Sequence, residues 1–327
     1  MKDNKLQNSG LKGKTVVITG ASSGVGRAAV EAFAHQGCNI VAVARGRKGI
    51  DEVTAYCRSL NVLALGVYAD MSIASEVEKA AAEALAVFGQ IDIWINNAGV
   101  MASGKFEEIP LEVHQQVIKT NLFGYMHGAY NAVKIFKQQN QGILINNISI
   151  GGFMPAPYSS VYSASKYGIR GMMECLQGEI SSRKHIHICN LYPQLQNSTG
   201  NLHSAKYSGF NVKIPFTASD PRDTAAKMVY LAKHPKKDLF PDLQAAALTN
   251  VYRLFPKMVI NTASAAVRTK MKLNKDKEGD AGNVLEHSKE PLRVYGNPPS
   301  KKTSNLSLAL FAGLGIGAAL VLLGRKS

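Results

Sequence analysis

The chain has 327 residues, enough for one large domain or two small ones, and its 46% hydrophobic and 19% charged residues are an ordinary globular mixture. Its formal net charge of +15 would suit nucleic acid, an anionic membrane or a phosphate-bearing cofactor. The sequence has no zinc-finger spacing, no RNA-binding aromatic motif and no C-x-x-C pair among its four cysteines, so we expect no nucleic-acid partner, no disulfide framework and no metal site.

Apolar runs alternate with helix-like stretches between residues 14 and 191. The runs are almost continuously apolar, which is typical of strands covered on both faces and therefore of a parallel sheet. Such alternation predicts an α/β fold with a doubly wound parallel sheet in three α/β/α layers. The expected strands are 15–19, 39–44, 62–68, 91–96, 142–148 and 186–193. The expected helices between them are 26–37, 51–60, 73–89, one that begins near 110, and 162–180.

The pattern changes after Pro193. Residues 194–218 are polar and rich in glycine and proline, which is typical of a lid or substrate loop, and a helix follows Pro221 with Asp220 as its expected N-cap. We place the end of this first domain, residues 10–250, after that helix. Residues 251–271 predict a basic amphipathic helix that packs on the domain or a partner, or contacts a membrane surface.

The last part of the chain divides into a polar and an apolar segment. Residues 272–305 are polar and turn-rich, so we expect a linker. Residues 306–323 are uncharged and mostly apolar between basic pairs, and a helix of this length would span roughly 30 Å, the thickness of a bilayer core. We therefore expect a C-terminal transmembrane helix; a buried core helix is the alternative.

A glycine-rich stretch, "TGASSGVG", follows the first expected strand at residues 19–26. Its spacing is G-x-x-x-G-x-G, and a loop at this position directs backbone N–H groups and the helix dipole at a pyrophosphate. A plain turn is the alternative for these residues taken alone. The residues that we expect to bind a cofactor here are Gly20, Ser22, Ser23, Gly24, Val25 and Gly26.

Further cofactor contacts are expected where the next strands end. Arg45 follows the second strand, and an arginine at this point suits the 2′-phosphate of NADP(H), whereas NAD(H) favours a carboxylate. The sequence therefore favours NADP(H) over NAD(H). Asp70 ends the third strand, where it could accept from the adenine amino group. The segment "NNAG" ends the fourth, where Asn97, Ala98 and Gly99 would let the chain run against the cofactor.

The candidate chemical groups are Ser149, Tyr162 and Lys166. Ser149 follows the fifth strand, and Tyr162 and Lys166 are four residues apart, on one helix face. A nearby ammonium favours the phenolate, so Lys166 would lower the pKa of Tyr162 toward the range useful for acid–base chemistry. The alternative is a tyrosine–lysine pair on the surface without a catalytic role. This alternative is less favoured because the expected helix lies at the ligand-binding edge of the sheet.

Taken in order, "TGASSGVG", Asp70, "NNAG", Asn121 in "KTNLFG", Ser149 and "YSASK" resemble the short-chain dehydrogenase/reductase family in its shorter single-domain branch. The resemblance covers about residues 10–250. It implies an extended Rossmann-like fold, an NAD(P)(H)-dependent alcohol–carbonyl oxidoreductase, and a homodimer or homotetramer.

The resemblance also implies residue roles. Tyr162 would be the catalytic acid/base, Ser149 would position the substrate, and Lys166 would tune Tyr162 and hold the nicotinamide ribose. Asn121 would support a water that relays protons to Lys166. Pro193 matches a cofactor-binding position, but Gln194 stands where the family usually has glycine, and the threonine that follows in the family corresponds to Ser198 or Thr199.

These observations predict a membrane-anchored NADP(H)-dependent oxidoreductase that interconverts a carbonyl and an alcohol, with a lipophilic substrate. A single C-terminal span would hold the catalytic domain on the cytoplasmic side of the bilayer. Two alternatives are a non-catalytic NADP(H)-binding scaffold or sensor at a membrane, and an acyl-thioester ketoreductase.

Overall fold

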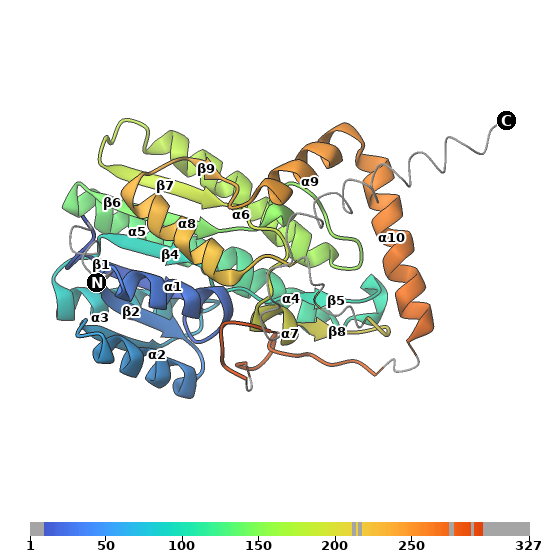
Figure 1. The fold of residues 1–327 in the computed structure, drawn as a ribbon, viewed down its shortest axis with the longest axis horizontal. Coiled ribbons are helices and arrows are strands. Elements are labelled where there is room, and N and C mark those ends of the chain that lie inside the picture. The colour runs from blue at the N-terminus through green and yellow to red at the C-terminus, as the bar shows by residue number, and fades with distance from the viewer. Residues whose placement is uncertain (1–9, 211–213, 215–217, 275–277, 289–290, 297–327) are drawn as a thin grey trace, which may run out of the picture.

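One parallel sheet organises the chain in the strand order β3-β2-β1-β4-β6-β7-β9. Figure 1 shows this order from β2 to β9. The computed structural model describes residues 10–210, 214, 218–274, 278–288 and 291–296. The predicted doubly wound parallel sheet is confirmed, and the strand order reverses between β1 and β4, where such sheets bind ligands. The strands are β1 (Thr15–Thr19), β2 (Asn39–Ala44), β3 (Ala64–Tyr68), β4 (Ile93–Asn96), β6 (Gly142–Asn147), β7 (Ile186–Leu191) and β9 (Asp238–Leu239).

Helices cover both faces of the sheet and give the predicted three layers (Figure 1). One face carries α1 (Gly24–Ala34), α2 (Arg47–Ser59) and α8 (Pro221–Lys233). The other carries α3 (Ala74–Phe88), α5 (Gly124–Gln139) and α6 (Ser160–Glu179), with α4 (Leu111–Ile118) preceding α5. Val16 and Ile18 pack on the first group of helices and Val17 on the second, so successive strand residues must all be apolar.

Buried asparagines connect the strands near their carboxyl ends. Asn96, Asn146 and Asn190 are paired in register on β4, β6 and β7. The Asn96 amide donates to Asn146 Oδ1 at 3.0 Å, the Asn146 amide donates to Asn190 Oδ1 at 3.2 Å, and Asn190 donates to Asp238 of β9 at 3.3 Å. A shift in strand register would leave these buried amides unpaired, so this asparagine ladder fixes the relative heights of the strand ends.

Small elements and the described residues of the interval 278–296 lie at the carboxyl edge of the sheet. β5 (Ala102–Ser103) pairs with β8 (Ala205–Lys206), which follows α7 (Thr199–Leu202) in the segment expected as a lid or substrate loop. The interval 251–271 belongs to two helices, α9 (Leu243–Leu254) and α10 (Pro256–Leu273), because Pro256 cannot continue a helix and begins the second one. Within the interval expected as a linker, residues 278–288 and 291–296 return to the sheet edge and pack there.

The predicted transmembrane span, 306–323, lies outside the described residues. Among the helices that the structure does describe, none is long and apolar enough to cross a membrane.

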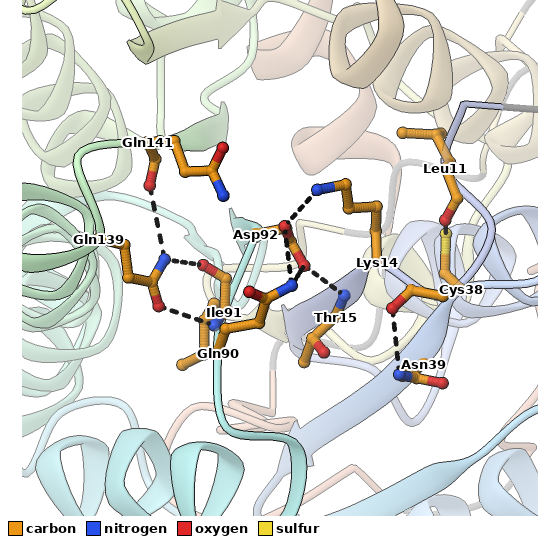
Figure 2. A network of polar contacts seen from close by, with 11 residues as sticks. Leu11, Lys14, Thr15, Cys38, Asn39, Gln90, Ile91, Asp92, Gln139 and Gln141 are labelled. Carbon is orange, nitrogen blue, oxygen red and sulfur yellow. Dashed lines mark hydrogen bonds and ion pairs between the residues drawn. The ribbon is translucent and has the colours of Figure 1, made fainter.

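A polar network at the opposite edge of the sheet joins the starts of β1 and β4 (Figure 2). The Asp92 carboxylate is 7% exposed and accepts from Lys14 Nζ at 2.7 Å, the Thr15 backbone N–H at 2.9 Å and Gln90 Nε2 at 3.1 Å. Figure 2 shows these three donors converging on one side chain. Asp92 therefore holds the central strands together at the edge remote from the cavity described below.

Replacing Asp92 tests this role. In Asp92→Ala the buried Thr15 N–H loses its acceptor, so the free energy of unfolding should fall by about 1–3 kcal/mol. Urea denaturation measures the change. The control is Asn39→Ala, which removes only an exposed bond to the Gly13 carbonyl and should change stability by less than about 0.5 kcal/mol. Equal effects of the two substitutions would contradict the assignment.

Candidate active site

The carboxyl ends of the strands open into a cavity of about 380 Å³. Its walls come from segments far apart in the sequence, including the loops after β1, β2, β4, β6 and β7. The predicted site residues that line it are Gly20, Ser22, Ser23, Gly24, Val25, Gly26, Arg45, Asp70, Asn97, Ala98, Gly99, Ser149, Tyr162, Lys166 and Pro193. Asn121 lies behind this surface. The structure therefore brings the separate motifs into one cavity.

The glycine-rich loop after β1 is packed too closely to accept side chains. A Cβ on Gly26 would lie 2.0 Å from the Gly20 carbonyl oxygen, and one on Gly20 would lie 2.8 Å from Ala98 Cα. Gly20 also has a φ of +67°, a conformation that favours glycine. The Asn97 amide donates to the Thr19 carbonyl at 2.9 Å and binds the "NNAG" segment to this loop. Gly24, Val25 and Gly26 at the start of α1 thus line the cavity on a closely packed backbone, as a phosphate site requires.

Ser149, Tyr162 and Lys166 converge at Gly151. A Cβ at Gly151 would lie 3.3 Å from Tyr162 Cε1, 3.5 Å from Ser149 Oγ and 3.7 Å from Lys166 Cγ. Ser149 begins a short 3₁₀ turn, η3 (Ile150–Gly152), and its Oγ accepts from the Gly151 N–H at 3.1 Å. Lys166 lies one helical turn after Tyr162 on α6. The hydroxyl, phenol and amine therefore share one end of the cavity, and Gly151 leaves the space between them open.

Asn121 lies in a π-helical turn, η2 (Lys119–Phe123), between α4 and α5. Its side chain accepts from the Val100 N–H at 2.8 Å, and donates to the Val100 carbonyl at 2.9 Å and to Ser165 Oγ at 3.0 Å. Ser165 in turn donates to the Tyr162 carbonyl at 2.6 Å. Asn121 therefore ties the segment after β4 to the helix that carries Tyr162 and Lys166. π-turns are frequent at functional sites.

Burial controls the protonation of both α6 groups. Lys166 is 5% exposed, and desolvation lowers its pKa to about 7. Burial raises the pKa of Tyr162 above its ordinary value, and a hydrogen bond with Ser149 opposes this only in part. This direction is opposite to the lowering expected from the sequence, because desolvation of the phenolate outweighs any help from Lys166. The tyrosine is held as a neutral phenol.

The loop after β7 departs from the expected contacts. The Pro193 carbonyl accepts from the Ile150 N–H at 3.0 Å and joins this loop to η3. Gln194 Nε2 donates to Ser219 Oγ at 2.7 Å and to Gln244 Oε1 at 2.6 Å, so its side chain bridges the loop to α9. Thr199 Oγ1 donates to the Arg293 carbonyl at 2.9 Å, and Ser198 forms a backbone bridge with Tyr295.

Comparison with known proteins agrees with this geometry. A family model for the short chain dehydrogenases matches residues 14–206. The chain belongs to the short-chain dehydrogenase family. It is 29% identical over 257 residues to the uncharacterized oxidoreductase YxnA of Bacillus subtilis, an alignment that covers 78% of this chain and 72% of that protein. It is 35% identical over 175 residues to 3beta-hydroxysteroid dehydrogenase 1 of Eggerthella lenta, covering 53% of this chain and 67% of that one.

A solved structure shares the fold. The short-chain dehydrogenase/reductase of Burkholderia phymatum, determined in complex with NAD, superimposes with a TM-score of 0.68 at 22% identity, covering 77% of this chain and 97% of that one. The family resemblance and the Rossmann-like fold expected from the sequence are thereby confirmed, and the chain is an oxidoreductase of the short-chain dehydrogenase type.

In this short-chain dehydrogenase, four lining residues lie in the interval that we expected to be a linker. These residues are Asn283, His287, Ser288 and Leu292. The polar composition of this interval does not indicate them, but two of its few apolar residues do: Val284 in "GNVLEH" and Val294 in "LRVYG" are both buried. Apolar residues within a polar interval can therefore indicate packing.

The lowered pKa of Lys166 predicts a pH-dependent stability. Between pH 7 and 10.5 the folded chain holds a neutral amine while the unfolded chain still binds a proton, so raising the pH favours folding. Below about pH 7 the Lys166 amine is charged in both the folded and the unfolded chain, and the folded chain then carries the full cost of burying that charge. The stability of wild type relative to Lys166→Met should therefore rise from pH 6 to pH 9, in urea melts at about one-unit steps.

The exposed Lys79 on α3 provides the control for this experiment. The difference between wild type and Lys79→Met should stay constant over the same pH range. A constant difference for Lys166→Met as well would show that the amine is not held neutral.

Proposed function

We propose that this chain is an NADP(H)-dependent oxidoreductase that interconverts a carbonyl with a secondary or primary alcohol. The observation that carries the proposal is the convergence of Ser149, Tyr162 and Lys166 at Gly151, in the same cavity as the glycine-rich loop. The close backbone packing of Gly20 and Gly26 around the start of α1 fits a dinucleotide.

Each side chain has a role that its surroundings support. A bound nicotinamide cofactor supplies or accepts the hydride. In reduction, the Tyr162 phenol donates its proton to the carbonyl oxygen, and the raised pKa keeps that proton available. Ser149 Oγ donates a hydrogen bond to the same oxygen and orients it. Lys166 holds the nicotinamide ribose. In alcohol oxidation, the Tyr162 phenol would first release its proton to the proposed relay of water and Lys166, and the resulting phenolate would take up the alcohol proton.

Asn121 has its amide hydrogens engaged by the Val100 carbonyl and Ser165 Oγ. It therefore acts first as a positioning residue for α6. The remaining lone pair of its Oδ1 and the backbone of the π-turn are the groups that could hold the proposed proton-relaying water.

The preference for NADP(H) depends on Arg45. Arg45 follows β2 and lines the same cavity as Ser22 and Ser23, at the position where a carboxylate would instead select NAD(H). Asp70 Oδ2 lies 3.7 Å from Arg45 Nη1, so the aspartate orients the arginine as well as facing the adenine end of the cavity. The Burkholderia relative was determined with NAD; the preference proposed here rests on this chain's own residues. Comparing KM for NADPH and NADH measures it.

Replacing the catalytic phenol tests the function. Tyr162→Phe should lower kcat for carbonyl reduction by at least about 100-fold with little change in the Kd of NADPH, because only the proton donor is removed. Steady-state kinetics with a panel of ketones and aldehydes gives kcat, and NADPH fluorescence gives Kd. The control is Tyr167→Phe. Tyr167 lies on the same helix and its hydroxyl donates to the Phe153 carbonyl, so this variant should keep wild-type activity.

Three outcomes would overturn this proposal. Full activity of Tyr162→Phe would exclude the mechanism. Tight NADPH binding by the wild type without turnover of any carbonyl would favour the scaffold or sensor, and turnover restricted to acyl thioesters would favour the ketoreductase.

We further propose a lipophilic substrate and a membrane location, with 306–323 as a single C-terminal span and the catalytic domain on the cytoplasmic side. Apolar side chains line the same cavity as Tyr162, namely Val100, Met101, Ile150, Met154 and Leu195. The corner between α9 and α10 exposes 71% of Leu254 and 55% of Phe255. Residues 243–273 contain five basic and no acidic side chains, a charge pattern that suits an anionic bilayer surface.

A tryptophan at this corner tests the contact separately from the span. In full-length Phe255→Trp, vesicles that contain phosphatidylserine should shift the tryptophan emission to shorter wavelength, and vesicles of phosphatidylcholine alone should do so less. Trp94 is fully buried and contributes a constant background. The control is Leu63→Trp, an exposed site before β3. No shift with either vesicle would contradict the proposed contact.

Self-association is also proposed. Phe123, Met126 and Tyr130 are exposed at helical spacing along the start of α5 and form an apolar stripe. Such a stripe on a long helix supports the homodimer or homotetramer implied by the family. Light scattering of the purified chain measures the state.

A further inference from the structure

Residues 278–288 and 291–296, called the strap below, cross one side of the dinucleotide cavity. The strap is fastened first to β8, where Lys206 and Asp280 exchange two backbone hydrogen bonds of 2.8 Å each. The Asn283 N–H then donates to the His203 carbonyl at 2.9 Å, and Val284 is fully buried beside Val113 and Ala205. These contacts define a seated position for the strap.

From this position the strap occupies the Arg45 side chain. Arg45 Nη2 donates to the carbonyl oxygens of Asn283 and Glu286, at 2.6 Å each, and Nη1 lies 3.4 Å from the Val284 carbonyl. The His287 ring also lies over Gly46, since a Cβ there would be 3.2 Å from His287 Cδ2. The strap therefore uses the donors that, in the proposed function, bind a 2′-phosphate.

A second group of contacts covers the glycine-rich loop. The Arg293 carbonyl accepts from the Gly24 N–H at 3.0 Å and from Thr199 Oγ1 at 2.9 Å. The Leu292 carbonyl accepts from Arg27 Nη1 on α1. Gly24 begins α1, so its N–H is one of the helix-terminal donors available for a pyrophosphate. At this end too, a strap carbonyl is placed where a phosphate oxygen would accept.

We propose that the strap is an intramolecular competitor of the cofactor: its carbonyl oxygens at residues 283, 286 and 293 occupy the donors for the 2′-phosphate and the pyrophosphate, and NADP(H) binds after they are released. The proposal rests on the proposed NADP(H) function. Phosphate oxygens are charged and form stronger hydrogen bonds with arginine than neutral carbonyls do, so the cofactor can displace the strap. Its apparent affinity is reduced by the fraction of molecules in which the strap is seated.

Gly282→Val tests the competition by changing a strap residue that does not itself line the cavity. Gly282 has a φ of +52°, and a Cβ there would lie 2.2 Å from the His203 carbonyl oxygen, so valine prevents the strap from seating. If the strap is seated in about nine-tenths of wild-type molecules, only about one-tenth can bind NADPH, so the Kd of NADPH should fall about tenfold in the variant. NADPH fluorescence and calorimetric titration of full-length protein measure it, and hydrogen exchange of the Gly24 amide should quicken.

The control is Gly89→Val. Gly89 also has a positive φ, +74°, but its Cβ would meet nothing within 4 Å, and it ends α3. This variant has the same backbone strain without displacing the strap and should keep the wild-type Kd. An unchanged Kd in Gly282→Val would overturn the competition, and a higher one would show that the strap instead forms part of the binding site. Failure of wild type and variant alike to bind either nicotinamide dinucleotide would overturn the proposed function, and the competition with it.

A reversible lock gives the opposite test. Lys206 and Asp280 form a hydrogen-bonded antiparallel pair, whose Cα atoms are typically about 5.5 Å apart, within disulfide range. With Lys206→Cys and Asp280→Cys combined, oxidation should raise the Kd of NADPH and a reductant should restore it. Equal affinities of the oxidised and reduced forms would contradict the proposal.

Discussion

The asparagine ladder is the constraint on which the site depends. Asn96, Asn146 and Asn190 join β4, β6 and β7 through side-chain hydrogen bonds in a fully buried layer, and Trp94 Nε1 adds a donor to Asn96 at 3.0 Å. Hydrophobic packing alone tolerates small sliding of strands, whereas a buried amide without a partner costs about 1–3 kcal/mol. The ladder therefore sets the height at which each strand ends, and with it the positions of the loops that carry Asn97, Ser149 and Pro193.

The rest of the catalytic end follows from that alignment. Asn97 continues from Asn96 and bonds to the loop after β1, while Ser149 follows β6 by two residues and meets α6. Asn121 then links the segment after β4 to α6 through Val100 and Ser165. A polar layer inside the sheet, rather than the apolar core, thus carries the geometry from the strands to Tyr162 and Lys166.

Much of this could be predicted from the sequence, because the signals are local. Continuous apolar runs indicate strands covered on both faces, and glycines and the tyrosine–lysine spacing lie within single segments. All the site residues predicted from the sequence line the cavity except Asn121, which lies behind its surface. The break before Pro256 was also readable, since proline ends a helix, although we expected one continuous helix there.

The remaining features depend on contacts that no local pattern records. The strap binds Arg45 and Gly24 through backbone carbonyls, which every residue has, so its composition predicts a linker equally well. The protonation of Tyr162 and Lys166 depends on how completely the fold removes both groups from water, which spacing along a helix does not reveal. Long-range backbone contacts and desolvation are therefore the two properties for which the three-dimensional structure was needed.

Ser149 shows what the site demands of the fold. With φ of 100° and ψ of 153°, it occupies a region of backbone conformation that is almost restricted to glycine, at a cost of about 1–3 kcal/mol. Hydrogen bonds on both sides, from the Ile148 N–H to the Leu191 carbonyl and from the Ile150 N–H to the Pro193 carbonyl, hold it there. Selection for stability alone would place glycine at this position. The serine therefore lowers the stability of the fold and supplies a hydroxyl that glycine lacks, so at this position activity is favoured over stability.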